Sequence, residues 1–422
     1  MSYLVTILIA TLLLTVPISV CLGLSAMAMV WQTGTNTMIV AQKLFAAVDT
    51  APLLAIPFFV LAGNFMNSGG ISRRLVSFAN ACLGARHGGL AMVTVAASMF
   101  FAAISGSGPA TTAAIGSIMI PAMVARGYDI RFAATTQATA GQLGVIIPPS
   151  IPFVIFGLAT GVSIGDLFMA AFLPGVMIGC SLMLVAYLIS RSRDYKGDRA
   201  YTWAERFAAF RESFLALLMP VIILGGIYTG VFTPTESAVV ASGYALFIGV
   251  FVYKEIKIDS LYKIFADSAI LVSTIMIIIS TAGIFAYILT LFRVPHMVGE
   301  WFAAVTASPI VFLLIINVLL LFVGMFFDTT PAIVVLGPIL TPVAQSLGID
   351  PVHFGVIMVC NLAMGFITPP FGVNLFVISQ LTKLRVEQLG KTLLIYIGVL
   401  FINVLVISYV PAISLWLPGM MK

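Results

Sequence analysis

Residues 107–149 read SGPATTAAIGSIMIPAMVARGYDIRFAATTQATAGQLGVIIPP, and residues 329–370 read TTPAIVVLGPILTPVAQSLGIDPVHFGVIMVCNLAMGFITPP. At an offset of 221 residues, positions 116–149 and their counterparts share nine identities in 34 positions, where unrelated sequences would share roughly two. The identical pairs are Gly116 with Gly337, Ile118 with Ile339, Pro121 with Pro342, Gly127 with Gly348, Asp129 with Asp350, Gly144 with Gly365, Ile146 with Ile367, Pro148 with Pro369, and Pro149 with Pro370. Each half of the chain therefore interrupts an apolar segment with Gly, Pro and hydroxyl residues. Paired interruptions of this kind are the best sequence pointer to the binding site of a membrane transporter.

The composition indicates an all-α polytopic membrane protein. Hydrophobic residues make up 61% of the chain and charged residues 8%, whereas a soluble domain has about 25% charged residues. The apolar runs are continuous and long enough to cross ~30 Å of hydrocarbon, so they predict helices rather than barrel strands. We expect full spans near 3–20, 52–67, 168–190, 214–232, 237–253, 266–291 and 392–417, with a further span inside 21–50.

The charged and sulfur-containing residues exclude several classes of function. The net charge of +5 comes from Lys and Arg in connecting segments, where they mark cytoplasmic loops, so we expect contact with membrane lipid and no nucleic-acid partner. No G-x-x-x-x-G-K-[ST] loop occurs, so the chain is not expected to use ATP. The four cysteines show no paired spacing and predict neither a metal site nor a disulfide. The three histidines flank the expected spans, so a buried role for them is not expected.

The first half predicts a re-entrant hairpin over 89–126 followed by a broken helix over 131–160. The two hairpin arms are about 15 residues each, short for a span of ~20, and basic residues flank both outer ends. A hairpin that enters and leaves from the cytoplasm explains both observations and places the tip, SGSGP from Ser105 to Pro109, at membrane depth. In the following helix, Pro148, Pro149 and Pro152 remove amide donors and must open the helix.

The second half predicts the same order, with a hairpin over 308–347 and a broken helix over 352–381. The flanks of this hairpin lack the basic enrichment of the first, and the basic residues Lys383, Arg385 and Lys391 follow the broken helix instead. We therefore expect inverted-topology repeats, 1–190 and 214–422, joined by a cytoplasmic segment over 191–213 that forms an amphipathic or surface helix. On this topology both termini face the periplasm.

The two tips and two breaks supply the candidate binding residues, almost all of which carry oxygen. Oxygen ligands suit hard cations, unwound carbonyls suit Na⁺, and half-helix N-termini attract anions. The alternative is that Gly and Pro only kink packed helices and that the hydroxyls bond back to their own helices. The candidate residues are Ser105, Ser107, Gly108, Pro109, Thr111, Gln142, Pro148, Ser150, Asp328, Thr329, Thr330, Asn361, Thr368, Pro369 and Asn374.

Asp328 is the most distinctive of these residues. It follows the apolar run FVGMFF, and an ionisable side chain at membrane depth costs ~3 kcal/mol on insertion scales and indicates a function. We expect it to be a cation ligand. The structural alternative, which is compatible with ion binding, is that Asp328 caps the helix that follows.

The long motifs of the chain resemble the large membrane subunit of tripartite ATP-independent periplasmic (TRAP) transporters. The resemblance covers essentially the whole chain and has no departure in either hairpin. The motifs that carry it are FFVLAGNFMNSGGISRRLV, SGSGPATTAAIGSIMIPAM, GQLGVIIPPSIPFVIFG, PTESAVVA, GMFFDTTPAIVVLGPILTPVA and MGFITPPFGVNLFV.

This resemblance implies a sodium-driven importer of an organic acid, of the sialic acid or C4-dicarboxylate type, in the bacterial inner membrane. It implies two partners, a periplasmic substrate-binding protein and a small four-helix membrane subunit, the latter expected as a separate chain. It also implies an elevator mechanism, in which hairpins and broken helices move within a scaffold. By its motifs it implies one Na⁺ site lined by Ser105, Ser107, Gly108 and Pro109 with the Pro148 break, another lined by Asp328, Thr329 and Thr330 with the Thr368 break, and the substrate between them.

Two other functions would use some of the same segments and residues. A stand-alone sodium/dicarboxylate symporter would share the hairpins but need no binding protein. An intramembrane protease would need Ser105 or Ser107 as a nucleophile, or Asp328 paired with Asp129. No histidine at depth is expected to activate a serine, and Asp129 belongs to a turn far from Asp328, so we expect no enzymatic activity.

Overall fold

The computed structural model describes residues 2–306 and 308–421 and confirms an all-helical chain, without a strand among those residues. Eight of the described helices are long and apolar enough to cross a membrane, or nine if one bent pair is counted as a span. The first half contains α1 (Ser2–Leu13), α2 (Ile18–Gln32), α3 (Met38–Ala46), the 3₁₀ turn η1 (Ala51–Leu54), α4 (Ala55–Ser68), α5 (Ile71–Leu83), α6 (Gly89–Ser105), α7 (Gly108–Ala125), α8 (Ile130–Gly141), α9 (Leu143–Ile146), α10 (Ile151–Thr160) and α11 (Ile164–Ser192). The second half contains α12 (Trp203–Tyr228), α13 (Pro234–Phe247), the π-helical turn η2 (Ile248–Val252), α14 (Ile258–Leu291), α15 (Val294–Val305), α16 (Pro309–Phe326), α17 (Thr329–Ser346), α18 (Pro351–Gly365), α19 (Val373–Thr382), the 3₁₀ turn η3 (Val386–Leu389), α20 (Gly390–Tyr409) and α21 (Pro411–Met421).

Two helical hairpins form at the duplicated motifs. In the first, α6 and α7 pack side by side and are joined by Gly106 and Ser107. In the second, α16 and α17 are joined by Phe327 and Asp328. The arms contain 17 or 18 residues each, which is longer than the sequence suggested for the first hairpin, because the helices continue into the residues flanking the tip.

Each hairpin is followed by a tight turn and a broken helix. Gly127 and Gly348 adopt positive φ angles of 82° and 77° at the two turns, and Asp129 and Asp350 then cap α8 and α18 by accepting backbone hydrogen bonds. The first broken helix bends by 40° between Ile146 and Ile151, and the second stops at Gly365 and resumes at Val373. The Pro148–Pro149 and Pro369–Pro370 peptide bonds within the breaks are both cis.

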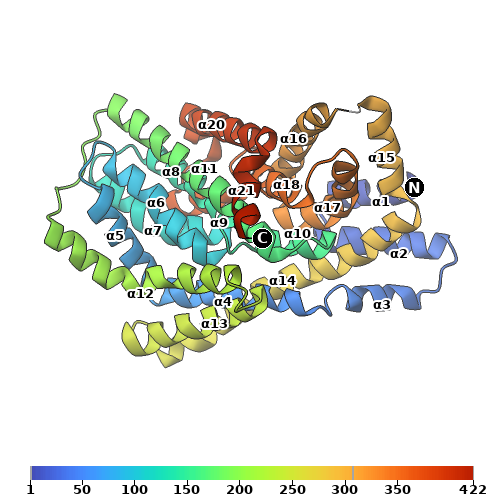
Figure 1. The fold of residues 1–422 in the computed structure, drawn as a ribbon, viewed down its shortest axis with the longest axis horizontal. Coiled ribbons are helices and arrows are strands. Elements are labelled where there is room, and N and C mark those ends of the chain that lie inside the picture. The colour runs from blue at the N-terminus through green and yellow to red at the C-terminus, as the bar shows by residue number, and fades with distance from the viewer. Residues whose placement is uncertain (1, 307, 422) are drawn as a thin grey trace.

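The two halves interlock through their corresponding elements. The second arm of the first hairpin, α7, packs against α19, which is the second part of the second broken helix. Conversely, the second arm of the second hairpin, α17, packs against α10, which is the second part of the first broken helix. Figure 1 shows α12, α13, α4 and α3 along the lower edge of the view, with α6, α7, α9, α10 and α18 nearer its middle.

The structure corrects three of the expected segments. The first expected span, 3–20, is divided into α1 and the start of α2, which pack against each other, because Pro17 cannot continue the helix and Thr15 turns the chain with a positive φ of 57°. The last, 392–417, is divided at Pro411, where α21 begins. The connecting segment 191–213 is not a separate surface helix: its end belongs to α12, which begins at a capping box formed by Thr202 and Glu205.

The irregular part of that segment, residues 193–202, lies across the base of the first hairpin. The carbonyl of Tyr195 accepts a hydrogen bond from the amide of Gly88 at 2.9 Å, and the amide of Asp198 donates to the carbonyl of Gly84 at 2.7 Å. The Asp198 carboxylate forms an ion pair with Arg126 at 2.7 Å. The turn before α6 and the turn after α7 are thereby both bonded to residues 193–202, which we call the strap.

Candidate functional site

The tip of the first hairpin is a cluster of hydroxyl groups at the N-terminus of α7. Ser107 caps α7 by accepting a hydrogen bond from the Ala110 amide at 3.4 Å. The hydroxyls of Ser105 and Thr111 lie 2.9 Å apart, and Thr111 also donates to the carbonyl of Ser107 at 2.8 Å. Gly106 ends α6 in the left-handed conformation, with φ of 61°, which a glycine adopts without steric cost.

The first helix break lies directly against this tip. The Ile151 amide, at the start of α10, donates a hydrogen bond to the carbonyl of Gly106 at 3.3 Å. A Cβ atom at Gly106 would stand 3.0 Å from the carbonyl oxygen of Pro149, and one at Gly144 would collide with the backbone of Ser107. The structure thus brings the predicted tip residues and the Pro148–Ser150 break into contact.

The second helix break also reaches the first tip. A Cβ atom at Gly108 would stand 2.9 Å from the Phe366 ring and 3.5 Å from Oδ1 of Asn374. Asn374 also donates a hydrogen bond from Nδ2 to the carbonyl of Ala138 on α8 at 3.0 Å. Residues from both halves of the chain therefore meet at the N-terminus of α7.

The second tip is built around a carboxylate. Asp328 caps α17, and its Oδ1 accepts hydrogen bonds from the amide of Thr329 at 2.6 Å and from the hydroxyl of Thr329 at 3.1 Å. Thr329 and Thr330 are buried, whereas Asp328 is exposed on the surface of the chain. The capping role proposed as the alternative for Asp328 is present, and it leaves the carboxylate open to a further ligand.

The second tip packs on the second break through glycines and aromatic rings. A Cβ atom at Gly365 would collide with the backbone of Gly324, so α16 and α18 touch backbone to backbone. The rings of Phe326 and Phe371 lie edge to face with centroids 6.1 Å apart. These contacts place the Asp328 tip beside the residues Thr368–Pro370 that follow α18.

Several hydroxyls at the breaks make the local hydrogen bonds expected of kinked helices. Ser150 donates to the carbonyl of Val145 at 2.6 Å, and Thr368 donates to that of Met364 at 2.8 Å. A hydroxyl that donates keeps its lone pairs and can still bind a cation. Such bonds are therefore compatible with a binding role as well as with a purely structural one.

Two buried side-chain amides near the first tip carry polar atoms that have no hydrogen-bond partner among the described residues. Both polar atoms of the Gln142 side chain and Oδ1 of Asn374 are buried without a hydrogen bond. Gln142 lies between Gly141 and Gly144. A Cβ atom at Gly141 would collide with Thr112, and a Cβ atom at Gly144 would collide with Ser107. Buried polar groups are almost always satisfied, so unpaired amides at this position favour a ligand over simple packing.

Asn361 lies in a different cluster from the other candidates. Its Nδ2 donates to Oδ1 of Asn317 on α16 at 2.7 Å, and Asn317 in turn bonds the Ser408 hydroxyl on α20 at 3.1 Å. His353, which we expected at a span end, is buried, and its Nε2 lies 3.3 Å from the carbonyl of Ser408. Four residues of this cluster join three helices, and no hydrogen bond among the described residues links Asn361 to a tip.

The structure adds two polar residues that were not among the candidates. A cavity of about 170 Å³ lies beside the first tip, lined by Ser105 and Ser107 and, from α4, by Asn64 and Asn67. Both asparagines belong to the motif FFVLAGNFMNSGG. Their spacing of three residues, which places both on one face of a helix, was the available signal.

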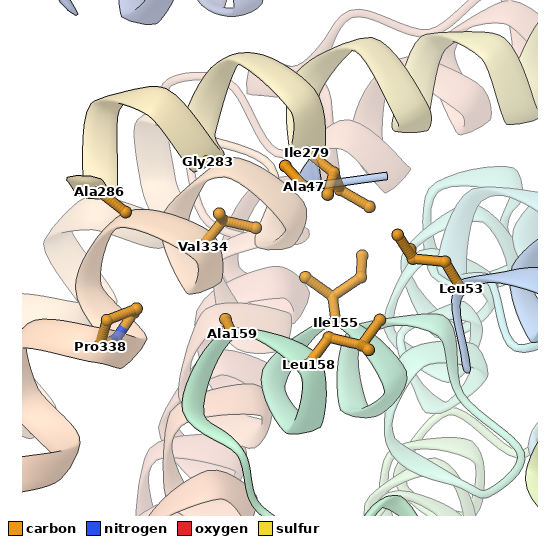
Figure 2. A pocket seen from close by; sticks show the side chains of 10 residues that line it. All are labelled: Ala47, Leu53, Ile155, Leu158, Ala159, Ile279, Gly283, Ala286, Val334 and Pro338. Carbon is orange, nitrogen blue, oxygen red and sulfur yellow. The ribbon is translucent and has the colours of Figure 1, made fainter. Parts of the chain in front are cut away.

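A second cavity, of about 200 Å³, is apolar and lies between α14 and the pair α10 and α17. Figure 2 shows Leu53, Ile155, Leu158 and Val334 projecting into a common space beneath Gly283 and Ala286 of α14. Its lining carries no polar side chain among the described residues, so it offers packing space and no means of orienting an anion.

Comparison with known proteins matches the chain to one family profile and to several individual relatives. Residues 5–413 match the profile of the DctM component of the tripartite ATP-independent periplasmic transporters. The chain is 47% identical over 406 residues to the isethionate TRAP transporter permease protein DctMQ of Oleidesulfovibrio alaskensis, covering 96% of this chain and 64% of that relative. It therefore spans less than two thirds of that relative's length.

Two other relatives match over nearly their full length. The C4-dicarboxylate TRAP transporter large permease protein DctM of Pseudomonas aeruginosa is 44% identical, with 90% of this chain and 89% of the relative covered. The sialic acid TRAP transporter large permease protein SiaM of Vibrio cholerae is 38% identical, with 92% and 90% covered. These relatives are transport permeases, not enzymes.

Two solved transporters share the fold at low sequence identity. The YdaH transporter of Alcanivorax borkumensis superimposes with a TM-score of 0.65 and 14% identity, covering 90% of this chain and 88% of that chain. MtrF of Neisseria gonorrhoeae gives a TM-score of 0.59 and 12% identity, covering 90% and 83%. The likeness supports a transporter fold for the arrangement of helices described above.

Proposed function

This chain belongs to the DctM family, the large permease subunits of TRAP transporters, and from that premise we propose that it couples the inward movement of Na⁺ to the import of an organic acid. The observation that carries the proposal is the meeting of two hairpin tips with two helix breaks. The first meeting supplies the tip hydroxyls, the unpaired side-chain amide of Gln142 and the unpaired Oδ1 of Asn374. The second supplies the exposed carboxylate of Asp328.

Sodium is the coupling ion that best suits these groups. Hydroxyl, amide, carbonyl and carboxylate oxygens are hard ligands, and the coordination of Na⁺ by unwound carbonyls is a recurrent arrangement in transporters with broken helices. We assign one Na⁺ to Ser105 and Ser107 beside the first break. A second Na⁺ is assigned to Asp328, Thr329 and Thr368 beside the second break.

The direction of transport follows from the charge balance. A single charge that crosses 100 mV is worth ~2.3 kcal/mol. Two Na⁺ moving inward with one monoanion carry net positive charge, so both the sodium gradient and a negative-inside membrane potential drive uptake. The hairpins and broken helices are proposed to move within a scaffold, as in an elevator, and thereby expose the site to each side in turn.

Two partners complete the proposed transporter. A periplasmic substrate-binding protein delivers the organic acid, and a small membrane subunit pairs with this chain in the bacterial inner membrane. The named acids of the relatives differ, being isethionate, a C4-dicarboxylate and sialic acid, so the family alone leaves the acid open.

The test is uptake by the purified complex in proteoliposomes. Labelled succinate, isethionate and N-acetylneuraminate are each offered with the binding protein, under an inward gradient of either Na⁺ or K⁺. We expect uptake of one acid that requires Na⁺ and the binding protein. Equal uptake in K⁺ would refute sodium coupling, and full uptake without the binding protein would identify a stand-alone symporter instead.

A further inference from the structure

The polar cavity between α4 and the first hairpin tip is the part of the molecule that the sodium sites leave unexplained. Asn64 and Asn67 face it from α4, Ser107 and Ala110 from the start of α7, and Leu271 from α14. It therefore joins helices at the edge of the molecule to the hairpin that carries a proposed sodium site.

Asn64 is held in position by a bond outside the cavity. Its Nδ2 donates to the hydroxyl of Ser268 on α14 at 2.7 Å, and that hydroxyl donates in turn to the carbonyl of Ile264 at 2.7 Å. Oδ1 of Asn64 accepts no hydrogen bond from the described residues. The bond to Ser268 thus fixes the amide and leaves Oδ1 available as an acceptor on a residue that lines the cavity.

Asn67 and Ser107 supply hydrogen-bond donors, whereas Asn64 supplies an acceptor. Oδ1 of Asn67 accepts a long hydrogen bond of 3.4 Å from the hydroxyl of Ser72, while its Nδ2 donates to no described residue. The Ser107 hydroxyl accepts from Ala110, and its proton is available to another acceptor. The cavity therefore presents both donors and acceptors, and no titratable side chain is among the described residues that line it.

The first tip and α4 are in close contact beside this cavity. A Cβ atom at Gly63 would stand only 3.3 Å from Cα of Ser105. A ligand in the cavity would therefore lie within reach of α4 and also next to the hydroxyl cluster of the tip. Occupation of the proposed sodium site and of the cavity would be physically linked through Ser105 and Ser107.

The size and chemistry of the cavity point to a short organic anion. Its volume of about 170 Å³ lies below the ~300–1,000 Å³ of sites for drug-sized ligands. A carboxylate or sulfonate suits the free donors of Ser107 and Asn67. A second oxygen group with a proton to donate, such as a hydroxyl or a protonated carboxyl, suits Oδ1 of Asn64.

We propose that Asn64 and Asn67 of α4 form, with Ser107, the substrate-binding half-site for a short-chain organic acid that carries a second oxygen group. This inference rests on the proposed function. It makes α4 a specificity-determining helix that lies outside the hairpins and broken helices. It favours acids of about four carbons or fewer, because both oxygen groups of a short acid can reach Asn64 and Asn67 together within a space of about 170 Å³.

The experiment compares wild type with Asn64→Leu and Asn67→Leu in the reconstituted complex described above. Each substitution keeps approximately the side-chain volume and removes the amide. We expect wild type to take up succinate or isethionate, and both variants to raise KM for that acid about tenfold or more, because a hydrogen bond to an anion is lost. Asn36→Leu, in an exposed loop where Asn36 only accepts a bond from the Met38 amide at 2.9 Å, should leave KM unchanged.

A second pair of measurements separates binding from misfolding. Asn67→Gln restores an amide and should recover part of the affinity. In a cysteine-free background, Ala110→Cys, at another position that lines the cavity, should react with a maleimide more slowly when the transported acid is present. Unchanged KM in both leucine variants, uptake of N-acetylneuraminate alone, or no protection of Ala110→Cys would each overturn the half-site while leaving the proposed function intact. Absence of sodium-driven uptake of any of the three acids by wild type would instead overturn the proposed function.

Discussion

The carbonyl of Gly106 accepts a hydrogen bond from the amide of Ile151 at 3.3 Å, which ties the first hairpin tip to the start of α10. Two segments that the sequence marks independently, by SGSGP and by the Pro148–Pro149 pair, are therefore one structural unit. The bond uses an amide at the start of a helix, which has no partner within that helix. A change that displaces the tip must also displace the break.

Gly106→Ala should impair transport through its contact with the break. The substitution places a Cβ in a left-handed conformation, at a cost of about 1 kcal/mol, and brings it to 3.0 Å from the carbonyl oxygen of Pro149. Gly161→Ala is the matched control, because Gly161 has a similar φ of 75° and nothing within 4 Å of its Cβ. We expect sodium-driven uptake to fall about tenfold or more in the first variant and to stay near wild type in the second. Equal uptake by the two would show that contact with the break is unimportant.

Asp328→Asn should abolish sodium-dependent uptake while the protein still folds. Asparagine is as good a helix cap as aspartate, so the capping of α17 is retained, but the negative charge that balances a bound cation is lost. Asp350→Asn makes the same change at the cap of α18, where Oδ1 accepts from the amides of Val352 and His353, and should leave uptake intact. Initial rates are measured against Na⁺ concentration for both variants. Wild-type sodium dependence in Asp328→Asn would remove Asp328 from the ion site.

Gly365→Ala should destabilise the packing of α16 on α18. The added Cβ collides with the backbone of Gly324, and overpacking of a core typically costs about 1–3 kcal/mol. Gly398→Ala in α20 has nothing within 4 Å and should be neutral or slightly stabilising, because alanine favours the helix. The apparent melting temperatures of the two purified variants measure this difference in stability. The prediction fails if Gly365→Ala melts with or above Gly398→Ala.

Asp198 should make the strap at the base of the first hairpin sensitive to acid. Burial acts to raise the pKa of this carboxyl, but hydrogen bonds from Asn80, from the Arg199 amide and from Arg126 hold the pKa below its ordinary value. A lowered pKa in the folded state contributes stability above the ordinary carboxyl pKa of about 4, and that stability is lost as the pH falls through the folded value. Asp198→Asn should therefore lower the melting temperature at neutral pH, and the difference from wild type should shrink as the pH falls below about 4.

The control for the strap is Asp194→Asn. Asp194 lies 4.0 Å from His87, and both side chains are largely exposed, so its removal should change stability little at any pH. A difference between wild type and Asp198→Asn that stays constant down to strongly acidic pH would contradict the linkage. Equal effects of the two substitutions would assign the loss to surface charge in general.

The positions of the tips and breaks could be predicted from the sequence because they depend on local chemistry. Pro148 and Pro149 cannot continue a helix, and Asp328 is a helix cap by residue type and position, and the structure has a break before Ile151 and a cap at Asp328. Hydropathy averages over Pro17 and therefore does not predict the division of the first expected span. The polar composition of 191–213 hides the capping box at Thr202, where α12 begins. The role of α4 depends on which helices meet in space, and no local pattern in FFVLAGNFMNSGG specifies that it faces the first tip.

Asn317 and Asn361 should contribute to stability without affecting sodium binding. Both are buried, and they join α16 and α18 by a side-chain bond of 2.7 Å that continues to Ser408 on α20. A double-mutant cycle with Asn317→Ala and Asn361→Ala should give a coupling energy of about 1 kcal/mol, the range found for side-chain hydrogen bonds within membranes. The folded fraction of each variant should show wild-type dependence of uptake on Na⁺, because neither residue contacts a tip. Additive losses of stability would show that the bond contributes nothing, whereas a raised Na⁺ requirement in Asn361→Ala would return that residue to the ion site suggested by its place in the sequence.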